Sequence, residues 1–421
     1  MAEESILTDE FLRQLINVGE ADILVGVPTY NNAATVGPVV QKIRAGLLKC
    51  FPRERAVIVN ADGGSRDGTQ DLVRGTSVND QRYVSDLPAL RTLHCISAKY
   101  EGGPAAGAAL RSILAAAELL RASACAVIAA DSTNLEPEWI ERLLRPVYRD
   151  AIDLVMPLHR RHKFDGLLVR TLIYPMMRAL YGKKIREPYA SEFAFSGRLG
   201  SHFLGQEVWQ NEAGREGSEI CLAVAAMTGE FRLAQTFLGS KSHADSRSAD
   251  LVTALRQTVG ALFWSLEANF ETWSSSHDSQ PVPLLNAGPE VSVEPLRVNR
   301  KRLHRMFCSG VAELEPVLRT TLSAGTLAEL QRIAGLAEDD FRYSDELWIR
   351  TVYEFASSYH KSVISRDHIL QALAPLYRGK TYTFLVENRD ASGEEVDENV
   401  ERLCMAFEQL KPFLVELWKE K

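Results

Sequence analysis

The sequence predicts an α/β fold with a mostly parallel sheet and flanking helices, followed by an all-helical region. Between Asp22 and about Phe237, short apolar runs rich in β-branched residues alternate with amphipathic helical patterns, as in successive βα units. After about Ala249 the apolar residues recur only at helical spacing. The length of 421 residues allows two or three domains. The expected segments are an N-terminal helix in 1–20, a sheet domain in 21–248 and a helical domain in 249–421.

The elements of the sheet domain are predicted one by one along the chain. A helix is expected to begin near Thr35, because Val36, Val39 and Val40 start an apolar stripe at helical spacing. Another helix fits 104–120, where a proline occupies the first turn and a run of small residues allows a backbone or a ligand to approach closely. The apolar runs expected to form strands are 23–27, 55–60, 90–97, 125–130, 153–157 and 231–237.

The second half of the chain contains no strand pattern of this kind. Apolar residues repeat with a helical period, and a polar stretch with prolines over 274–295 is expected to be a surface connection. The segments predicted to be helical include 251–263, 327–333, 346–355 and 400–418.

Composition excludes several classes of protein. The 48 Lys and Arg residues against 55 Asp and Glu residues give a net charge of −7, so the chain lacks the basic excess of a nucleic-acid binder. With 46% hydrophobic and 24% charged residues, the chain is expected to fold around substantial cores and not to be disordered.

Cysteine usage and the apolar windows predict the cellular compartment. The six cysteines include no Cys-x-x-Cys pair and most lie in apolar runs, so we expect reduced core residues. The acidic start of the chain does not resemble a signal peptide. Charges such as Arg170 and Arg178 interrupt the most apolar windows, so no membrane span is expected. The predicted location is the cytoplasm.

Two polar motifs follow the first two predicted strands. The first strand ends in Val-Pro-Thr-Tyr-Asn-Asn, which contains Pro28, Tyr30 and Asn31. The second ends in Asn-Ala-Asp-Gly-Gly-Ser-Arg-Asp-Gly-Thr, where Asp62 can accept hydrogen bonds from a nucleobase or a ribose. The carboxyl ends of parallel strands share the edge at which open α/β folds bind ligands. Taken singly, each motif is equally well a turn or a helix cap; together they favour a ligand site.

As an ordered set, these motifs resemble the GT-A glycosyltransferases of the family 2 type over residues 21–245. The resemblance implies a nucleotide-sugar donor, with GDP-, UDP- and ADP-hexose all compatible with the motifs. The residues that it places against the donor are Pro28, Tyr30, Asn31, Asp62, Gly103 and Asp131.

The same resemblance implies a divalent cation, Mg²⁺ or Mn²⁺, bound to the diphosphate of the donor. Such enzymes usually carry Asp-x-Asp after a central strand, and here Ala129 replaces the first aspartate while Asp131 remains. His243, just after a late strand, is the expected second ligand, although a lone histidine is otherwise a surface residue. The arginine and tyrosine that follow this histidine in the family are absent here, and Lys241 or Arg247 would contact the diphosphate instead.

Further matches are to mannosylglycerate synthase and its glucosylglycerate-forming relatives, which include glucosyl-3-phosphoglycerate synthase. They begin with Pro-Glu-Trp-Ile at 137–140. Within the basic cluster 159–163, the resemblance implies that Arg161 holds the carboxylate of glycerate, and guanidinium geometry suits that task. A solvated basic turn is the alternative interpretation of this cluster.

Two acidic residues complete the predicted site. The segment 186–192 resembles a loop where donor sugar meets acceptor: Tyr189 and Ala190 would contact the acceptor and Glu192 is the matching acid. Glu187 stands in this loop where glutamine is common. Glu219 resembles a carboxylate that faces the acceptor hydroxyl, although Ser-x-Glu is equally a helix N-cap pattern. Glu192 and Glu219 are therefore the predicted catalytic residues.

The function expected from the resemblance is a retaining transfer of glucose or mannose to a small carboxylated acceptor. D-glycerate and 3-phosphoglycerate are the candidate acceptors, and the product would be a compatible solute or its precursor. The alternatives are a transferase that acts on a lipid phosphate or a polysaccharide, and a nucleotide-binding protein that has lost catalysis. The segment 375–381 near a helix end is expected either to close over the site or to pack against a second subunit in a homodimer.

Overall fold

The computed structural model describes residues 6–79, 93–101, 103–241, 250–286, 288 and 299–420, which fold as two compact units. The units interleave along the chain, and residues 161–188 belong with the helical half. The first, here called the sheet unit, comprises Met1–Arg160, Tyr189–Arg247 and Val282–Ser292. The second, the helical unit, comprises Arg161–Pro188, Ser248–Pro281 and Val293–Lys421.

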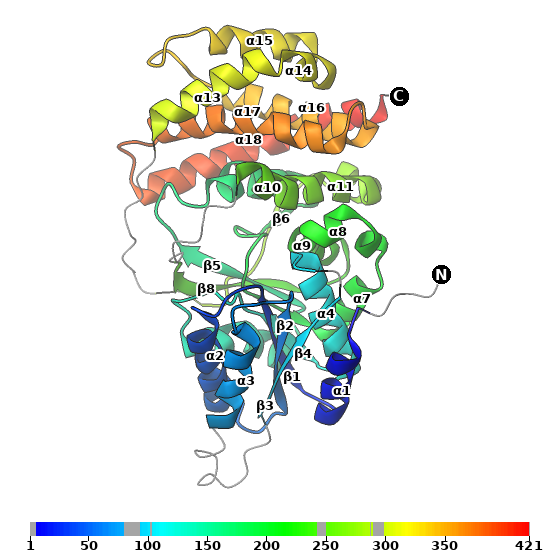
Figure 1. Cartoon of the computed structure of the whole chain (residues 1–421). Helices are drawn as coiled ribbons and strands as arrows, with labels where there is room; N and C mark the ends of the chain where they lie inside the picture. The colour runs from blue at the N-terminus through cyan, green and yellow to red at the C-terminus, as the bar shows by residue number, and fades with distance from the viewer. Residues whose placement is uncertain are drawn as a thin grey trace. The chain divides into compact units, whose positions relative to one another are not determined.

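The sheet unit is built on a seven-stranded sheet with the order β3-β2-β1-β4-β7-β5-β8 (Figure 1). The predicted α/β fold class is confirmed, and each predicted strand run overlaps a strand of this sheet. Every strand is parallel to its neighbours except β7, which is antiparallel to both β4 and β5. The strands are β1 (Ile23–Thr29), β2 (Ala56–Asp62), β3 (Leu93–Lys99), β4 (Ala124–Val127), β5 (Leu154–Arg160), β7 (Phe193–Ser196) and β8 (Leu233–Ser240).

Register brings the ends of the first three strands level. Thr29 of β1 pairs with Asp62 of β2, and Asp62 pairs with Lys99 of β3. The loops that follow these strands therefore emerge side by side at the carboxyl edge of the sheet. Since β7 runs in the opposite direction, the residue before it, Glu192, also lies at this edge.

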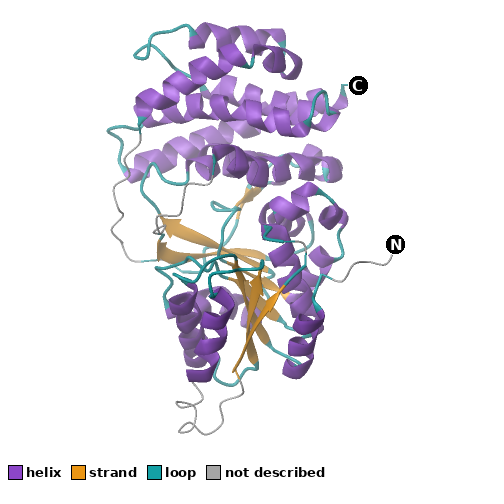
Figure 2. Cartoon of the chain, viewed as in Figure 1, coloured by secondary structure: helices purple, strands orange, loops and turns teal. Residues whose placement is uncertain are grey.

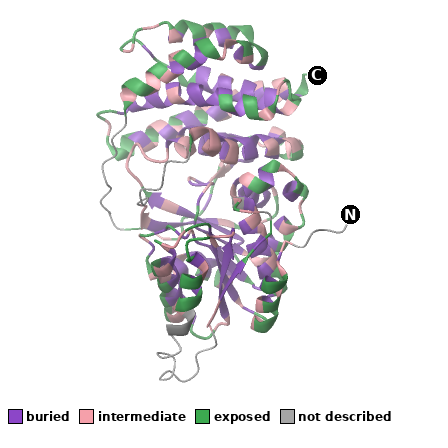
Figure 3. Ribbon diagram, in the orientation of Figure 1, coloured by how far each residue is buried: buried purple, intermediate pink, exposed green. Residues whose placement is uncertain are grey.

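Helices cover both faces of the sheet (Figure 2). The apolar stripes of α2 and α5 pack with β1, β2 and β4 in one core, while α4 packs on the other face, where Gly26 leaves room for Ile113. Figure 3 shows the central strands as almost wholly buried, as their apolar sequences predict. The helices of this unit are α1 (Asp9–Val18), α2 (Val36–Cys50), α3 (Thr69–Asn79), α4 (Ala106–Leu119), α5 (Pro137–Asp150), α7 (Gly197–Leu204), a 3₁₀ turn (Glu207–Gln210), α8 (Glu212–Glu216) and α9 (Ser218–Thr228).

The helical unit is held by buried aromatic rings and by ion pairs between helices. Trp348 donates its indole N–H to the backbone oxygen of Thr171 at 3.1 Å, and Arg178 pairs with Glu401 and with Glu408, the latter at 2.8 Å. The elements are a π-helical turn (Val169–Ile173), α6 (Tyr174–Tyr181), α10 (Leu251–Leu255), a second π-helical turn (Arg256–Gly260), α11 (Ala261–Ala268), α12 (Phe270–Ser275), α13 (Arg300–Glu313), α14 (Glu315–Thr321), α15 (Ala324–Ala334), α16 (Asp345–Lys361), α17 (Arg366–Glu387), α18 (Gly393–Lys419) and the strand pair β6 (Lys183–Lys184) and β9 (Gln280–Pro281).

All six cysteines are free thiols, and Cys125, Cys221 and Cys404 are buried. Among the helices of the described chain, none combines the length and the apolar character needed to cross a membrane.

Candidate functional site

The two motif loops that follow β1 and β2 are bound to each other. The backbone N–H of Asn31 donates to the Ser65 hydroxyl at 2.8 Å, and the side-chain oxygen of Asn31 accepts from the backbone N–H of Arg66 at 3.0 Å. The backbone N–H of Asn32 donates to the hydroxyl of Thr69 at 2.9 Å. Asn31 has a φ of 56°, a left-handed conformation that asparagine tolerates better than most residues. The motifs therefore form one connected double loop at the carboxyl edge.

Asp62 organises the second of these loops. Its carboxylate is fully buried and accepts hydrogen bonds from the backbone of Gly64 and Ser65 and from the side chains of Ser65, Gln70 and Thr29, at 2.6–2.8 Å. Burial opposes ionisation, but these hydrogen bonds outweigh it and lower the pKa of Asp62. The structure thus shows Asp62 shaping the loop, and its contact with a donor nucleotide stays a prediction.

The other residues predicted to contact the donor differ in exposure. The ring of Tyr30 is 51% exposed, and Pro28 is partly exposed beside Ala61 of β2. Gly103, just beyond β3, has a φ of 75°, which an L side chain would strain. The contacts of these residues with a donor nucleotide stay predictions.

Asp131 is exposed in the turn after β4, as the sequence predicts. No group of three or more His, Cys, Asp or Glu side chains within the described ranges has the arrangement of a metal site. His243, the expected second ligand, lies outside the described residues, as does Arg247. Hard cations such as Mg²⁺ take oxygen ligands and are commonly held by one or two carboxylates plus substrate phosphates. Asp131 fits such a site as one of its ligands.

Glu192 is the centre of a buried polar cluster at the same edge. Its carboxylate is fully buried, accepts from Lys241 Nζ at 2.7 Å and from the Ser191 hydroxyl at 3.3 Å, and also accepts a hydrogen bond from the Ser132 hydroxyl. Burial would raise the pKa of Glu192, but the charges of Lys241 and His159 and these hydrogen bonds lower it below its ordinary value. Glu192 is therefore held as an anion.

Glu219 has the opposite environment. It lies in the first turn of α9, and its carboxylate accepts a hydrogen bond from the Ser218 hydroxyl at 3.3 Å. Burial raises the pKa of Glu219. Burial and the neighbouring Glu219 raise the pKa of Tyr189, so these two predicted residues lie close together, next to the buried Ala190.

The start of α9 belongs to the carboxyl edge. A Cβ atom on Gly107, in the first turn of α4, would overlap with the backbone oxygen of Gly214 in α8. Since α4 begins just after β3 ends, α8 lies at that edge, and α9 begins at Ser218, immediately after it. The small residues of α4 allow a backbone to approach closely, as predicted.

Arg161, the predicted acceptor ligand, is in the helical unit and follows β5 directly. Its Nη2 lies 2.7 Å from Glu187 Oε2, and its Nη1 lies 3.4 Å from Asp165 Oδ2. Burial disfavours the charge, but these two carboxylates outweigh it and raise the pKa of Arg161. The guanidinium is therefore already paired with carboxylates of its own unit.

The two partners that sequence reasoning missed are thus Lys241 for Glu192 and Glu187 for Arg161. Glu187 is a departure from the family pattern and Lys241 is a predicted contact to the diphosphate, but neither pairing is predicted from the sequence. The available signal was charge: each is a residue of opposite sign in a neighbouring strand-end loop.

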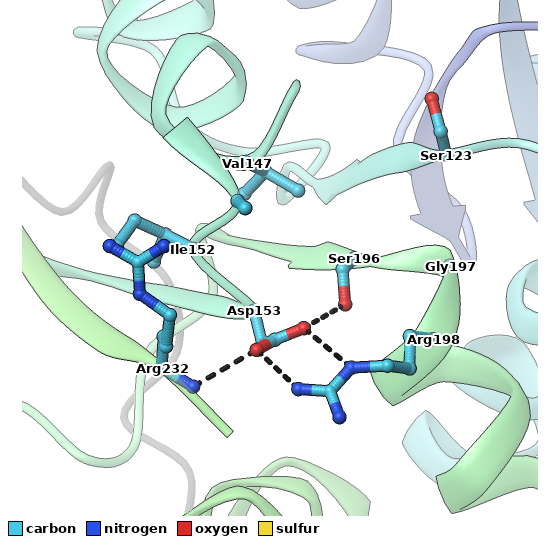
Figure 4. Close-up of a pocket in the computed structure, with 9 residues that line it drawn as sticks. Ser123, Val147, Ile152, Asp153, Ser196, Gly197, Arg198 and Arg232 are labelled. Atoms are coloured by element: carbon cyan, nitrogen blue, oxygen red, sulfur yellow. Dashed lines mark hydrogen bonds and ion pairs between the residues drawn. The ribbon is translucent and has the colours of Figure 1, made fainter. Parts of the chain in front are cut away.

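A separate pocket of about 480 Å³ opens at the amino edge of the sheet, away from these loops (Figure 4). Asp153, just before β5, accepts hydrogen bonds there from the Ser196 hydroxyl at 2.7 Å, Arg198 Nη2 at 2.7 Å and the backbone N–H of Arg232 at 2.9 Å. These bonds lower the pKa of Asp153 despite its burial. These hydrogen bonds connect the starts of β5 and β8 with the end of β7, so the role of Asp153 is structural.

Comparisons with known proteins give matches among solved structures alone. No protein-family model matches the chain, and no curated protein matches it. Glucosyl-3-phosphoglycerate synthase from Mycobacterium tuberculosis, in complex with Mn²⁺, uridine-diphosphate and glucosyl-3-phosphoglycerate, is 20% identical over 63% of this chain and 86% of that chain, with a TM-score of 0.42. The same enzyme with Mn²⁺, uridine-diphosphate-glucose and phosphoglyceric acid has a TM-score of 0.41 at 20% identity over 63% of this chain and 86% of that chain. With Mg²⁺ and uridine-diphosphate it has a TM-score of 0.41 at 20% identity over 60% of this chain and 82% of that chain.

These structures are of a protein in the group that the sequence motifs resemble. The ligands belong to those structures, and no residue role in this chain is taken from them.

Proposed function

We propose that the protein is a glycosyltransferase that moves glucose or mannose from a nucleotide-sugar to a small carboxylated acceptor, D-glycerate or 3-phosphoglycerate. The observation that carries the proposal is that two predicted catalytic carboxylates, Glu192 and Glu219, both lie at the edge that carries the motif loops. Burial favours the protonated form of Glu219, whereas Lys241 keeps Glu192 ionised. Pairs of titratable groups tuned in opposite directions are typical of sites that perform acid–base chemistry.

The donor is assigned to the double loop after β1 and β2. Pro28, Tyr30, Asn31 and Gly103 would contact the nucleotide, and Asp62 holds the loop in shape through its hydrogen bonds. Asp131 and His243 would hold Mg²⁺ or Mn²⁺, which supplies positive charge to the diphosphate when bound. With the donor fixed, the reacting sugar carbon is presented at the carboxyl edge.

The acceptor is assigned to Arg161, Tyr189, Ala190 and Glu219. Arg161 would bind its carboxylate, because a guanidinium offers paired donors to a carboxylate. Glu219 would orient the hydroxyl that attacks, and Glu192 would orient hydroxyls of the sugar. A bond forms between the acceptor oxygen and the anomeric carbon, the bond to the diphosphate breaks, and the leaving diphosphate oxygen takes the proton. We propose that the configuration is retained, and no covalent nucleophile is assigned.

A direct transfer assay tests this function. The full-length protein is mixed with GDP-, UDP- or ADP-hexose, Mg²⁺ or Mn²⁺, and D-glycerate or 3-phosphoglycerate, and the product is identified by mass spectrometry and its anomeric configuration by NMR. We expect a new glycosidic bond between the hexose and the acceptor, with the anomeric configuration of the donor retained. Transfer to a lipid phosphate or a polysaccharide instead, or tight nucleotide binding without any transfer, would favour one of the two alternative functions.

A matched pair of variants ties the assay to the site. Asp131→Ala is expected to lower kcat by at least about a hundredfold, because the cation that would neutralise the diphosphate loses a ligand. Asp71→Ala removes an exposed carboxylate from α3 and should leave kcat unchanged. Equal activity of both variants would remove Asp131 from the site.

A further inference from the structure

The guanidinium of Arg161 lies between two carboxylates of its own unit. Its guanidinium carries one positive charge, and it contacts two carboxylates, those of Glu187 and Asp165. Glu187 is buried, with 8% of its surface exposed, and the Arg161 side chain is 16% exposed, so water screens this cluster weakly.

The two carboxylates that contact Arg161 come from different parts of the chain. Asp165 is four residues after Arg161, and its other carboxylate oxygen accepts from the backbone N–H of Gly166 at 2.7 Å. Glu187 lies in the loop between β6 and β7, 26 residues after Arg161 in the sequence. The 2.7 Å distance to Glu187 is shorter than the 3.4 Å distance to Asp165, so Glu187 is the stronger partner.

We propose that Glu187 is an internal competitor for the carboxylate of the acceptor and so sets the charge selectivity of the enzyme. This inference rests on the function proposed above, in which Arg161 binds that carboxylate. An acceptor carboxylate and Glu187 are the same chemical group, and both need the same guanidinium. A carboxylated acceptor binds when it displaces Glu187 from Arg161, and the repulsion between the two carboxylates weakens its binding. An uncharged alcohol meets no such competition.

A purely structural role for Glu187 makes the opposite prediction. If Glu187 only holds Arg161 in position, removing its charge leaves a poorly placed guanidinium, and binding of the acceptor weakens. The two roles therefore differ in the direction in which the acceptor KM changes.

The substitution Glu187→Gln separates these roles, because it keeps the shape of the side chain and removes the charge. We expect the KM for D-glycerate to fall by roughly tenfold, which corresponds to the loss of about 1.4 kcal/mol of competition. The KM for the donor and the turnover with glycerol, an uncharged analogue of the acceptor, should stay unchanged. Asp397→Asn is the matched control, because it removes a carboxylate that pairs with Arg170 and Arg186 of the same unit.

Calorimetric titration of the full-length protein with D-glycerate separates this inference from the proposed function. Tighter binding of D-glycerate to the Glu187→Gln variant than to the wild type supports the competitor role, even if the wild type transfers no hexose and the proposed function fails. An unchanged or weaker affinity, with the variant folded, overturns the competitor role and leaves a working transferase untouched. A similar gain in the Asp397→Asn control would show a general charge effect and would also overturn it.

Discussion

At the level of single residues, the buried ion pair between Lys241 and Glu192 couples two charges closely. The Glu192 carboxylate is fully buried, and the Lys241 side chain is 9% exposed, so each charge depends on the other. A buried pair adds little over an apolar pair, but the loss of one partner leaves an uncompensated charge in a poorly solvated place. The Ser132 hydroxyl donates to Glu192, so the pair also stabilises the turn after β4. The predicted metal ligand Asp131 begins this turn.

Replacing Lys241 with methionine should therefore destabilise the protein markedly. We expect the free energy of unfolding at pH 7 to fall by about 3–5 kcal/mol, because Glu192 keeps its burial and loses its counter-charge. Chemical denaturation measures this loss. The double variant Lys241→Met with Glu192→Gln should recover most of the stability.

The control for this prediction is an exposed pair of the same type. Arg332 and Glu329 lie on the surface of α15, and Arg332→Met should cost at most about 1 kcal/mol. If Lys241→Met cost no more than Arg332→Met, or if the double variant were no more stable than the single one, the two charges would not depend on each other.

Sequence reasoning found strand-end residues well and found their partners poorly. Asp62 and Asp131 were predicted because strand ends can be recognised locally from apolar runs followed by polar turns, whereas Glu192, just before β7, was predicted from the resemblance of its loop. The partners are set by the tertiary structure: Lys241 is 49 residues from Glu192, and Glu187 is 26 residues from Arg161. No local pattern encodes such distances, and charge alone offers many equivalent pairings.

At the level of elements, the unexpected feature is the antiparallel strand β7. The sequence predicts βα units and a parallel sheet, but β7 has four residues and inserts between β4 and β5. A run this short has too few residues to show a strand period, so the pattern did not reveal it. Its direction matters for the site, because it places Glu192 at the carboxyl edge.

The contact between α4 and α8 yields a prediction at the same scale. Gly107→Ala should destabilise the protein by about 1–3 kcal/mol, because the added methyl group would meet the backbone oxygen of Gly214 and force the helices apart. Activity should fall as well, since α9 and Glu219 follow α8 directly. Thermal denaturation and the transfer assay measure the two effects.

Gly37→Ala is the matched control for this helix substitution. Gly37 lies in α2, and a methyl group there would have no neighbour within 4 Å. The higher helix propensity of alanine should then stabilise the protein by up to about 1 kcal/mol. If Gly107→Ala behaved like Gly37→Ala, the close approach of α8 would be wrong.

For the whole molecule, the sequence predicted two structural parts but not their interleaving. The change from alternating to purely helical patterns near residue 249 was visible, whereas residues 161–188 join the helical unit although strands flank them in the sequence. That segment is helical around α6, and its apolar residues Leu167 and Tyr174 belong to a core shared with α17 and α18. Which core a helix joins depends on long-range packing and not on its own periodicity.

The free energy of unfolding should depend on pH in part because of a buried lysine, Lys411 in α18. It is 6% exposed and its Nζ donates to the backbone oxygens of Leu180 and Ser276. Burial lowers its pKa to about 8 from 10.5, and the charge of Glu408 offsets only part of this. Between these values the unfolded chain holds a proton that the folded chain has lost, so this residue makes the free energy of unfolding rise with pH.

Comparison of the wild type with Lys411→Met across pH 7–10 isolates this contribution, because all other titrations are common to both chains. The difference in free energy of unfolding, wild type minus variant, should be constant below the folded pKa and then increase by about 1.4 kcal/mol per pH unit above it. Parallel curves for the wild type and Lys411→Met would show that the amine keeps its proton in the folded protein, and burial would then not control its charge.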